Sequence, residues 1–340
     1  MAIGIAVAAS LGAAGTAQAG KDLDAIKARG ALICGVPAAG IAGFGLADSQ
    51  GKWTGLDIDV CRAVAATIFG DAEKVKFTPL TAQQRFTALQ SGEVDILSNN
   101  TTWTLTRDTA LGLDFTAVTY YDGQGFMVNK KLGVKSAKEL GGATVCVAPG
   151  TTTELNLADY FRANKMTFKP VVIERVEEIR AAFFSGRCDV YTTDASSLYA
   201  TRAANVPAPA TSDDFVVLPE IISKEPLGPA LRHGDNQLVD IVRWTQFAML
   251  EAEENGIDSK NVDDMLKSEN PVIKRILGVT PGMGKALGVD EKWVYNIVKQ
   301  VGNYGESFDR NVGAGSPLKI ARGLNQLWSK GGIQYAPPIR

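Results

Sequence analysis

Short apolar segments alternate with amphipathic segments along most of the chain. Residues 31–36 form an apolar run of strand length, and the residues after them carry apolar side chains at helical spacing. The same succession begins again at residue 143. Alternation of this kind is typical of α/β proteins with mainly parallel sheets. The pattern predicts two α/β lobes, centred on residues 31–115 and 143–217.

The two predicted lobes resemble each other in sequence. The run ALICGVP at 31–37 is matched by ATVCVAP at 143–149, and ALQSGEVDI at 88–96 is matched by AFFSGRCDV at 182–190. In each copy a helix stops at Ser-Gly and an Asp opens the next strand, and the chemistry of helix ends explains part of this likeness. Two copies in the same order favour a repeated lobe.

Two segments connect these lobes, at residues 115–125 and 222–229. Because the chain crosses twice, we expect it to return to the first lobe after the second is complete. A long helix is then predicted from 235 to 255, with glycine at position 256 as its stop. Further helices are predicted at roughly 260–276, 290–303 and 316–329, the last with Ser316 as N-cap and Pro317 at its first position.

Composition disfavours several classes of function. The 340 residues include 35 basic and 37 acidic side chains, so a net charge of -2 provides no electrostatic attraction to nucleic acid or anionic lipid. One histidine, His233, and four scattered cysteines are a poor basis for zinc sites, a Ser-His-Asp triad or a Cys-His dyad. We therefore expect no metal, no cofactor and no nucleic-acid partner.

The first 19 residues have the features of a cleaved secretory signal. They are almost entirely apolar or small, and Ala17-Gln18-Ala19 precedes the first charge at Lys21. Their apolar core is too short to span a bilayer, and no lipid-attachment cysteine follows it. We expect an exported protein without a membrane anchor. No Lys or Arg opens the segment, so a start further upstream or a terminal tail is the alternative.

Four cysteines allow three pairings. Cys34 lies in the first strand-like run, and Cys61 falls on the buried face of the following helix, so these two can face each other. We predict a Cys34–Cys61 disulfide, which leaves Cys146 to pair with Cys188 within the second lobe. The alternative is four buried free thiols that act as small apolar side chains.

A polar cluster follows the buried strand that ends near residue 97. It contains Asn100, Thr101, Thr102 and Thr104, and Arg107 comes directly after it. At the carboxyl end of a parallel strand such a cluster faces the cleft where open sheets bind ligands. Backbone N–H groups and hydroxyls beside a guanidinium suit a carboxylate. A solvated turn with a surface arginine is the alternative.

The second lobe supplies a matching half of the site. Residues 149–154 end its first strand and start a helix, so free N–H groups point into the same cleft. Asp194 ends a later strand and can accept an ammonium group. Either feature alone is more often a helix cap. Together they predict a ligand that carries one carboxylate and one amine.

Several of these segments resemble the polar amino-acid family of periplasmic solute-binding proteins that serve ABC transporters. The resemblance rests on GKWTGLDIDV at 51–60, the run 102–107, GTTTE at 150–154 and Thr193-Asp194. The carboxyl-terminal part is similar to the general L-amino-acid-binding group, in NYGESFDRNV at 303–312, SPLKI at 316–320 and YAPPIR at 335–340.

The resemblance implies a type II periplasmic binding protein fold, α/β with two lobes joined by a two-segment hinge and a helical C-terminal extension. The implied parts are a signal peptide at 1–19, a first lobe at 20–122 plus 226–340, and a second lobe at 123–225. It further implies a periplasmic monomer that binds L-amino acids in the cleft and delivers them to ABC permease subunits.

The family pattern also implies roles for individual residues. Arg107 would hold the ligand carboxylate with Thr102 and either Thr151 or Thr152, while Asp194 and the Asn100 carbonyl would take the ammonium. Phe44 matches an aromatic wall, with a loop anchor as the alternative, and Arg85 matches a position that reaches toward the ligand side chain or lies in solvent. Ala82 stands where glutamine-specific relatives carry an aromatic, which predicts a wide pocket and broad selectivity.

An exported enzyme related to the cyclohexadienyl dehydratases is the principal alternative, because these enzymes share the two-lobed architecture. Such an enzyme needs a general acid near the reacting centre. Apart from Asp194, the acidic candidates near the cleft are Glu154, Glu174 and Glu225. We expect a binding protein with no catalytic residues.

Overall fold

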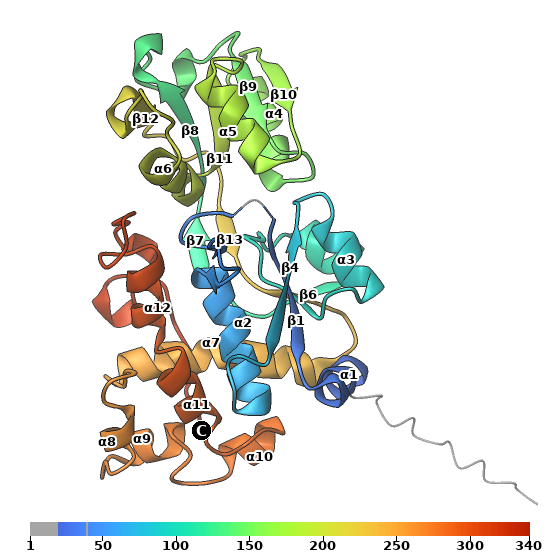
Figure 1. Ribbon diagram of the computed structural model, residues 1–340, viewed down its shortest axis with the longest axis vertical. Coiled ribbons are helices and arrows are strands. Elements are labelled where there is room, and N and C mark those ends of the chain that lie inside the picture. Colours follow the sequence, from blue (N-terminus) through green and yellow to red (C-terminus); the bar gives the residue numbers. More distant parts are fainter. Residues whose placement is uncertain (1–19, 39) are drawn as a thin grey trace, which may run out of the picture.

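The computed structural model describes residues 20–38 and 40–340, so the predicted signal peptide lies outside the described residues. The chain forms two α/β lobes connected by two short strands (Figure 1). Each lobe contains a five-stranded sheet. Among the residues described, we find no helix whose length and hydrophobicity would let it span a bilayer.

The first lobe contains the sheet with strand order β4-β1-β5-β14-β6. β14 follows the second lobe in the sequence but lies in the sheet of the first lobe, so the predicted return of the chain to the first lobe is observed. The strands are β1 (Leu32–Pro37), β4 (Val75–Leu80), β5 (Ile96–Leu97), β6 (Leu113–Phe115) and β14 (Ala230–Arg232), with a small hairpin of β2 (Leu46–Ala47) and β3 (Trp53–Thr54). Its helices are α1 (Lys21–Arg29), α2 (Leu56–Phe69), α3 (Arg85–Ser91), a π-helical turn at Thr106–Ala110 and α7 (Asn236–Glu254).

The second lobe repeats this arrangement with the strand order β10-β9-β11-β8-β12. Its strands are β8 (Gln124–Asn129), β9 (Thr144–Val147), β10 (Lys169–Val172), β11 (Val190–Asp194) and β12 (Phe215–Val217). Its helices are α4 (Thr152–Ala163), α5 (Val176–Phe184) and α6 (Ala195–Ala204), with 3₁₀ turns at Lys130–Leu132, Ala137–Glu139 and Ser212–Asp214.

The sequence echo corresponds to equivalent strands in the two sheets. β5 pairs in parallel with β1, and β11 pairs in parallel with β9. The helix before each of these strands ends at a glycine in the left-handed region, Gly92 (φ 80) and Gly186 (φ 79). The sheets are mixed rather than mainly parallel, because two strands of each sheet lie outside the repeated strand-helix-strand unit and run antiparallel to their neighbours.

The two connecting segments form a short antiparallel ribbon. β7 (Tyr120–Asp122) pairs with β13 (Glu225–Leu227), and Glu225 lies opposite Asp122. Figure 1 shows this ribbon between the lobes. Both chain crossings therefore run side by side at one place.

Each lobe contains one disulfide, and both predicted pairs are confirmed. Cys34 of β1 is bonded to Cys61 of α2, with Cα atoms 6.3 Å apart. Cys146 of β9 is bonded to Cys188, which precedes β11, with Cα atoms 5.7 Å apart. The alternative of free thiols is wrong for these four residues.

The predicted long helix is confirmed as α7. Asp235 caps it by accepting a hydrogen bond from the Leu238 N–H at 2.9 Å, and the helix ends at Glu254, just before Gly256. The chain then continues through five short helices and two 3₁₀ turns: α8 (Val262–Met265), α9 (Pro271–Ile276), α10 (Met283–Leu287), α11 (Trp293–Gln300), α12 (Tyr304–Asn311), Gly323–Asn325 and Trp328–Lys330.

These elements correct the helices predicted for the extension. The region 260–276 is broken at Asn270, which caps α9 ahead of Pro271. The helix predicted at 316–329 is wrong. The Ser316 hydroxyl donates to the Gly313 carbonyl, Lys319 has φ 49, and the Ile320 N–H returns to the Val312 carbonyl, which makes a turn in place of a helix start.

The extension packs on α2 and α7 and reaches the connecting strand β7. Asn325 accepts the Tyr121 N–H at 2.7 Å and donates to the Tyr121 carbonyl at 3.1 Å. The Tyr304 hydroxyl donates to the Thr119 carbonyl at 2.9 Å. Residues of α2, α7, α11 and α12 share one buried cluster, which includes Ala63, Met249, Ile297 and Phe308. The extension is thus part of the first lobe and supports one of its two connections to the second.

Candidate ligand-binding site

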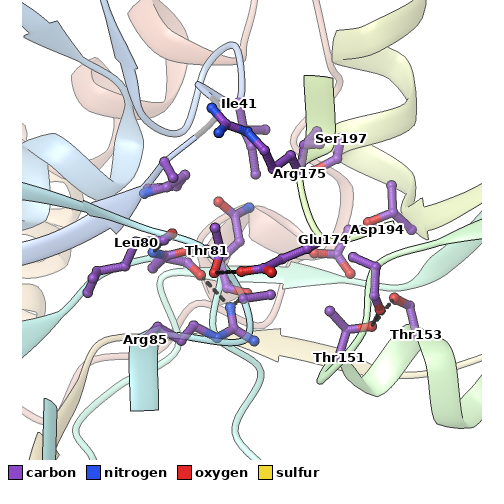
Figure 2. Close-up of a pocket in the computed structure, with 18 of the residues that line it drawn as sticks. Ile41, Leu80, Thr81, Arg85, Thr151, Thr153, Glu174, Arg175, Asp194 and Ser197 are labelled. Carbon is purple, nitrogen blue, oxygen red and sulfur yellow. Dashed lines mark hydrogen bonds between the residues drawn. The ribbon is translucent and has the colours of Figure 1, made fainter. Parts of the chain in front are cut away.

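A cavity of about 420 Å³ lies between the two lobes. β1 ends at Pro37, β4 at Leu80 and β11 at Asp194, and all three residues line the cavity. Parallel strands open their carboxyl ends toward the same edge, which is where open α/β sheets bind ligands. Figure 2 shows side chains of both lobes around this space.

Hydrogen bonds join the lobes beside the cavity. The Thr81 hydroxyl of the first lobe donates to Glu174 Oε1 of the second at 2.8 Å (Figure 2). Arg180 of the second lobe donates to the Gly40 carbonyl of the first at 3.2 Å. Contacts of this length require the lobes to be close together, so the structure is a closed arrangement.

Arg85 is a buried cation on the first-lobe wall. Its side chain is 5% exposed, lines the cavity and donates to the Asn99 carbonyl at 2.8 Å. Burial, and then the neighbouring Arg107 charge, lower the pKa of Arg85 to about 9. Its Nε is buried without a hydrogen-bond partner. A buried donor without a partner is costly, so Arg85 is prepared to donate to a ligand.

Asn100 presents a second unpartnered polar group. It lines the cavity at 8% exposure, and both its amide oxygen and its amide nitrogen are buried without partners. Its φ of 41 is in the left-handed region, which asparagine tolerates better than most residues. Asp57 holds this conformation by accepting the Asn100 N–H at 2.9 Å. The site therefore holds an amide with both donor and acceptor free.

Arg107 lies behind the first-lobe wall. Its guanidinium donates to the Thr102 carbonyl at 2.8 Å and lies 4.9 Å from the centroid of the Phe86 ring. Burial lowers the pKa of Arg107 to about 10, while the Glu225 and Asp194 carboxylates oppose that change. Arg107 is 6% exposed and is not among the residues that line the cavity. The side chain predicted to bind the carboxylate is thus close to the site but screened in this closed arrangement.

Asp194 is a buried acid on the second-lobe wall, opposite Arg85 in Figure 2. Burial first, and then the charges of Asp122 and Glu225, raise the pKa of Asp194 well above its ordinary value. The Arg85 and Arg107 charges oppose this shift without cancelling it. A ligand ammonium beside Asp194 would stabilise the ionised form that burial disfavours.

The predicted threonines have other partners. Thr151 caps α4: its hydroxyl accepts the Glu154 N–H at 3.1 Å and donates to the Ala148 carbonyl at 2.8 Å. The Thr102 and Thr152 hydroxyls both donate to Glu225. All three threonines line the cavity. Because their hydroxyl protons are already donated, a ligand can hydrogen-bond only to their remaining oxygen lone pairs and to their backbone groups.

Phe44 lies in the core. It is 1% exposed and packs edge-on against Tyr120, with ring centroids 5.2 Å apart. It is not among the residues that line the cavity. Phe44 therefore does not line the cavity as the expected aromatic wall; it holds its loop against the core, in agreement with the loop-anchor alternative. Its burial follows from the return of the extension, since Phe44, Tyr120 and Phe308 belong to one buried cluster.

The acidic residues considered as general acids all accept hydrogen bonds. Glu154 accepts the Gly150 N–H at 3.0 Å, and Glu174 accepts the Thr81 hydroxyl. Glu225 accepts four donors. Within residues 20–38 and 40–340, no group of three or more His, Cys, Asp or Glu is placed to hold a metal ion.

Part of this site carries no signal in the sequence. Arg175 and Ser197 of the second lobe line the cavity, and neither follows a motif that marks it. The sequence indicates Glu225 only as an acidic group near the cleft, whereas its position on a connecting strand places it between the threonines of the two lobes. The strand pairing that brings it there joins residues about a hundred positions apart, so no local signal reveals it.

Two lobes that close on a cavity with buried charged groups on opposite walls define a ligand-binding protein of the two-lobed α/β type. Residues 32–260 match the family model of the bacterial extracellular solute-binding proteins, family 3, and the chain belongs to this family.

Curated relatives match almost the full chain. The general L-amino acid-binding periplasmic protein AapJ of Rhizobium johnstonii is 58% identical over 98% of this chain and 97% of its own length. The glutamate/glutamine/aspartate/asparagine-binding protein BztA of Rhodobacter capsulatus is 54% identical over 99% of this chain and 97% of its own.

A solved structure is similar as well. It is an ABC transporter periplasmic binding protein from Brucella ovis with glutathione bound, 60% identical, with a TM-score of 0.90 over 94% of this chain and 99% of that chain. The chain shares the fold of type II periplasmic binding proteins, as predicted.

Proposed function

We propose that this protein is the periplasmic substrate-binding component of an ABC importer and binds L-amino acids with broad specificity between its lobes. The observation that carries the proposal is the placement of Asp194, a buried acid, across one cavity from Arg85, whose Nε is buried without a hydrogen-bond partner. An L-amino acid with a polar side chain supplies an ammonium group for Asp194 and a side-chain acceptor for Arg85. The full-length similarity to AapJ and BztA supports the same function.

The ligand carboxylate is assigned to Arg107 together with the backbone around Thr102 and the amino-terminal turn of α4 at Thr151 and Thr152. A bidentate guanidinium is the preferred partner of a carboxylate. The ammonium is assigned to Asp194 and the Asn100 carbonyl, and Arg85 faces the ligand side chain. Phe44 is left out of this set because it is buried in the core.

Broad selectivity follows from the size of the cavity. Ala82 lines it where an aromatic residue would narrow it, and its volume is about 420 Å³. In such a site, fixed polar groups bind the carboxylate and ammonium that all amino acids share, and the side chain lies in a wide part of the cavity. Each missing side-chain contact then separates the binding free energies of two amino acids by only about 1–3 kcal/mol. A γ-glutamyl peptide such as glutathione is a second candidate ligand, because the cavity has this volume and the Brucella relative contains glutathione.

The proposed lobes are residues 20–122 plus 226–340 and residues 123–225, with β7 and β13 as the hinge. Hinge closure of periplasmic binding proteins is a known class of domain motion, in which a ligand favours the closed state only by binding it more tightly than the open one. The proposed partners are ABC permease subunits that recognise the closed form of a monomer. Residues 1–19 are the proposed signal peptide, no membrane anchor is proposed, and the two disulfides suit an oxidising compartment.

Catalysis is not proposed, since the relatives AapJ and BztA, which match almost the full chain, are named as binding proteins. The test uses the full chain, exported to the periplasm and analysed by native mass spectrometry for co-purifying small molecules. The protein is then stripped in denaturant, refolded and titrated calorimetrically with L-amino acids, D-glutamate and glutathione. We expect binding of many L-amino acids and no binding of the D-enantiomer. Absence of binding to every compound would contradict the proposal, and so would product formation when the protein is incubated with the cyclohexadienyl acid arogenate.

A further inference from the structure

Glu225 occupies the point at which the chain crosses between the lobes. It is the first residue of β13, lies opposite Asp122 of β7, and is 1% exposed. A carboxylate this deeply buried requires donors for its oxygens. The donors that it finds come from both lobes.

One oxygen of Glu225 bridges the lobes. Its Oε2 accepts the Thr102 hydroxyl of the first lobe at 2.6 Å and the Thr152 hydroxyl of the second lobe at 2.8 Å. The two hydroxyl oxygens are 3.4 Å apart. A single oxygen can accept both donors only while the two lobes are closed.

The other oxygen is held from the second-lobe side alone. Oε1 accepts Asn156 Nδ2 of α4 at 2.8 Å and the Ser223 hydroxyl at 2.6 Å. Four donors use the acceptor capacity of an ionised carboxylate. The position of Glu225 is therefore set by α4 and by its own strand, and Thr102 is the partner that arrives from the first lobe.

This arrangement determines what the threonines offer to a ligand. A hydroxyl has one proton, and both threonines donate theirs to Glu225. Thr102 also accepts the Arg107 guanidinium through its carbonyl at 2.8 Å. Glu225 thus orients Thr102 and Thr152, and through Thr102 it is linked to the arginine assigned to the ligand carboxylate.

We propose that Glu225 is a positioning residue that holds Thr102 and Thr152 together in the closed state and thereby couples lobe closure to the carboxylate end of the ligand site. The proposal rests on the proposed function. When the lobes open, Glu225 must lose either its hydrogen bond to Thr102 or its hydrogen bonds to α4. The complete set of hydrogen bonds therefore exists only in the closed state and stabilises that state alone. Because these hydrogen bonds already favour closure, ligand binding needs to contribute less free energy to close the lobes.

The test compares Glu225→Gln with a matched control, Ser223→Ala. Glutamine has the size of glutamate, but its NH₂ group replaces one of the two carboxylate oxygens. That group then faces two hydrogen-bond donors, either Thr102 and Thr152 or Asn156 and Ser223. Ser223→Ala removes one donor to the same carboxylate without touching the interlobe bond. We expect the glutamine variant to raise the Kd for L-glutamate and L-glutamine at least about tenfold and to shift the ligand-free radius of gyration toward the open form by X-ray scattering. The control should change Kd by less than about threefold.

A double-variant cycle distinguishes the proposed positioning role of Glu225 from a purely structural role. In a Thr102→Val/Thr152→Val background, Glu225→Gln should have little further effect on Kd, since the donors through which it acts are gone. The proposal is overturned if Glu225→Gln lowers Tm equally with and without ligand and leaves Kd and the radius of gyration unchanged. If that variant does not fold, Glu225→Asp, which keeps the charge and shortens the reach, must show the loss of affinity.

Failure of the proposed function would be distinguishable. A wild-type protein that binds none of the amino acids contradicts the function, and the ligand-free radius of gyration of wild type and Glu225→Gln then decides the positioning role. A wild-type protein that binds, beside a glutamine variant that binds and closes equally well, contradicts the positioning role alone.

Discussion

Asp57 accepts the backbone N–H of Asn100 at 2.9 Å, and this contact fixes Asn100 at φ 41 with its amide in the cavity. The second oxygen of Asp57 accepts the Ser98 hydroxyl at 3.0 Å. Asp57 itself lies on the first turn of α2, behind the site, where it is 6% exposed. A buried acid thus supports the strained residue that faces the ligand.

Burial makes this acid a source of pH-dependent stability. It raises the pKa of Asp57 from 3.8 to about 6, so the folded protein binds the proton more tightly than the unfolded chain does. The stabilisation from that proton is complete below the ordinary pKa and is lost as the pH rises through the folded pKa. For Asp57→Asn, we expect the free energy of unfolding, taken relative to wild type, to increase by about 2 kcal/mol from about pH 4 to pH 7.5, because the variant does not lose this stabilisation.

Urea unfolding of both proteins at the two pH values measures this difference. Asp213→Asn, at an exposed position, is the control and should show no such change. An equal difference between wild type and Asp57→Asn at both pH values would contradict the expectation.

Arg107 should be essential for affinity. We expect Arg107→Ala to weaken amino-acid binding by about thirtyfold or more, because loss of one partner of a buried charge-assisted pair costs roughly 2–5 kcal/mol. Arg107→Lys, which keeps the charge but loses the planar fork, should recover only part of the affinity. Titration calorimetry is the measurement, with Arg162→Ala on the exposed face of α4 as the control. Unchanged affinity in Arg107→Ala would refute the assigned role.

Asp194 should make binding depend on pH. Burial raises the pKa of Asp194 well above its ordinary value, so its carboxylate takes up a proton at higher pH than an exposed aspartate does, and only the ionised form can accept an ammonium. We expect affinity to fall as the pH is lowered through this raised pKa of Asp194, with proton release on binding. Calorimetry in buffers of different ionisation enthalpy measures the released protons. Asp194→Asn should bind at least about a hundredfold more weakly at neutral pH and lose this dependence; a variant that retains it would exclude Asp194 as its source.

Asn325 should stabilise the junction of the extension with β7. Asn325→Ala leaves the N–H and the carbonyl of Tyr121 without these partners, so we expect the free energy of unfolding to fall by roughly 2–4 kcal/mol. Leu324→Ala, beside it and 58% exposed, should cost far less and serves as the control. Denaturant unfolding compares the two variants. Equal and small losses would show that the extension is held without this contact.

The disulfides should contribute to stability separately. Each closes a loop within one lobe, across sequence separations of 27 and 42 residues. For Cys146→Ser/Cys188→Ser we expect a loss of about 3–4 kcal/mol, with ligand affinity changed little because the pair lies outside the cavity lining. The intact mass of the exported wild type should be lower than that of the reduced chain by four hydrogens. A mass equal to that of the reduced chain would contradict both disulfides.

Local patterns predicted the elements that local chemistry controls. The helix 235–255 was predictable because Asp235 and Gly256 bracket a strong apolar stripe, and α7 has nearly these bounds. The Cys34–Cys61 pair followed from a strand and the next helix, which pack together in any right-handed strand-helix unit. The polar cluster around Asn100 was predictable because it directly follows a buried strand.

The extension shows where local patterns mislead. Ser316-Pro317 has the residue pattern of a helix start. The Ser316 hydroxyl nevertheless donates to the Gly313 carbonyl, and the chain turns so that Ile320 lies beside Val312. The helix α12 was missed although Asn303 and Glu306 form a capping box at its start. At Ser316 the contacts of the returning chain decide the conformation and leave no periodic signal, whereas α12 starts with a local signal in the sequence, the spacing of Asn303 and Glu306.

The amino-acid sequence by itself determined the type of fold, the pairing of the cysteines and the residues at the carboxyl ends of the strands, because these depend on spacing along a strand, a helix or a turn. Only the tertiary structure decided that Phe44 belongs to the core, that Arg107 lies behind the cavity wall, and that Glu225 accepts threonines from both lobes. Those outcomes depend on how distant segments pack and on which buried groups find partners, and burial sets the energy of a charge more strongly than its neighbours in sequence do.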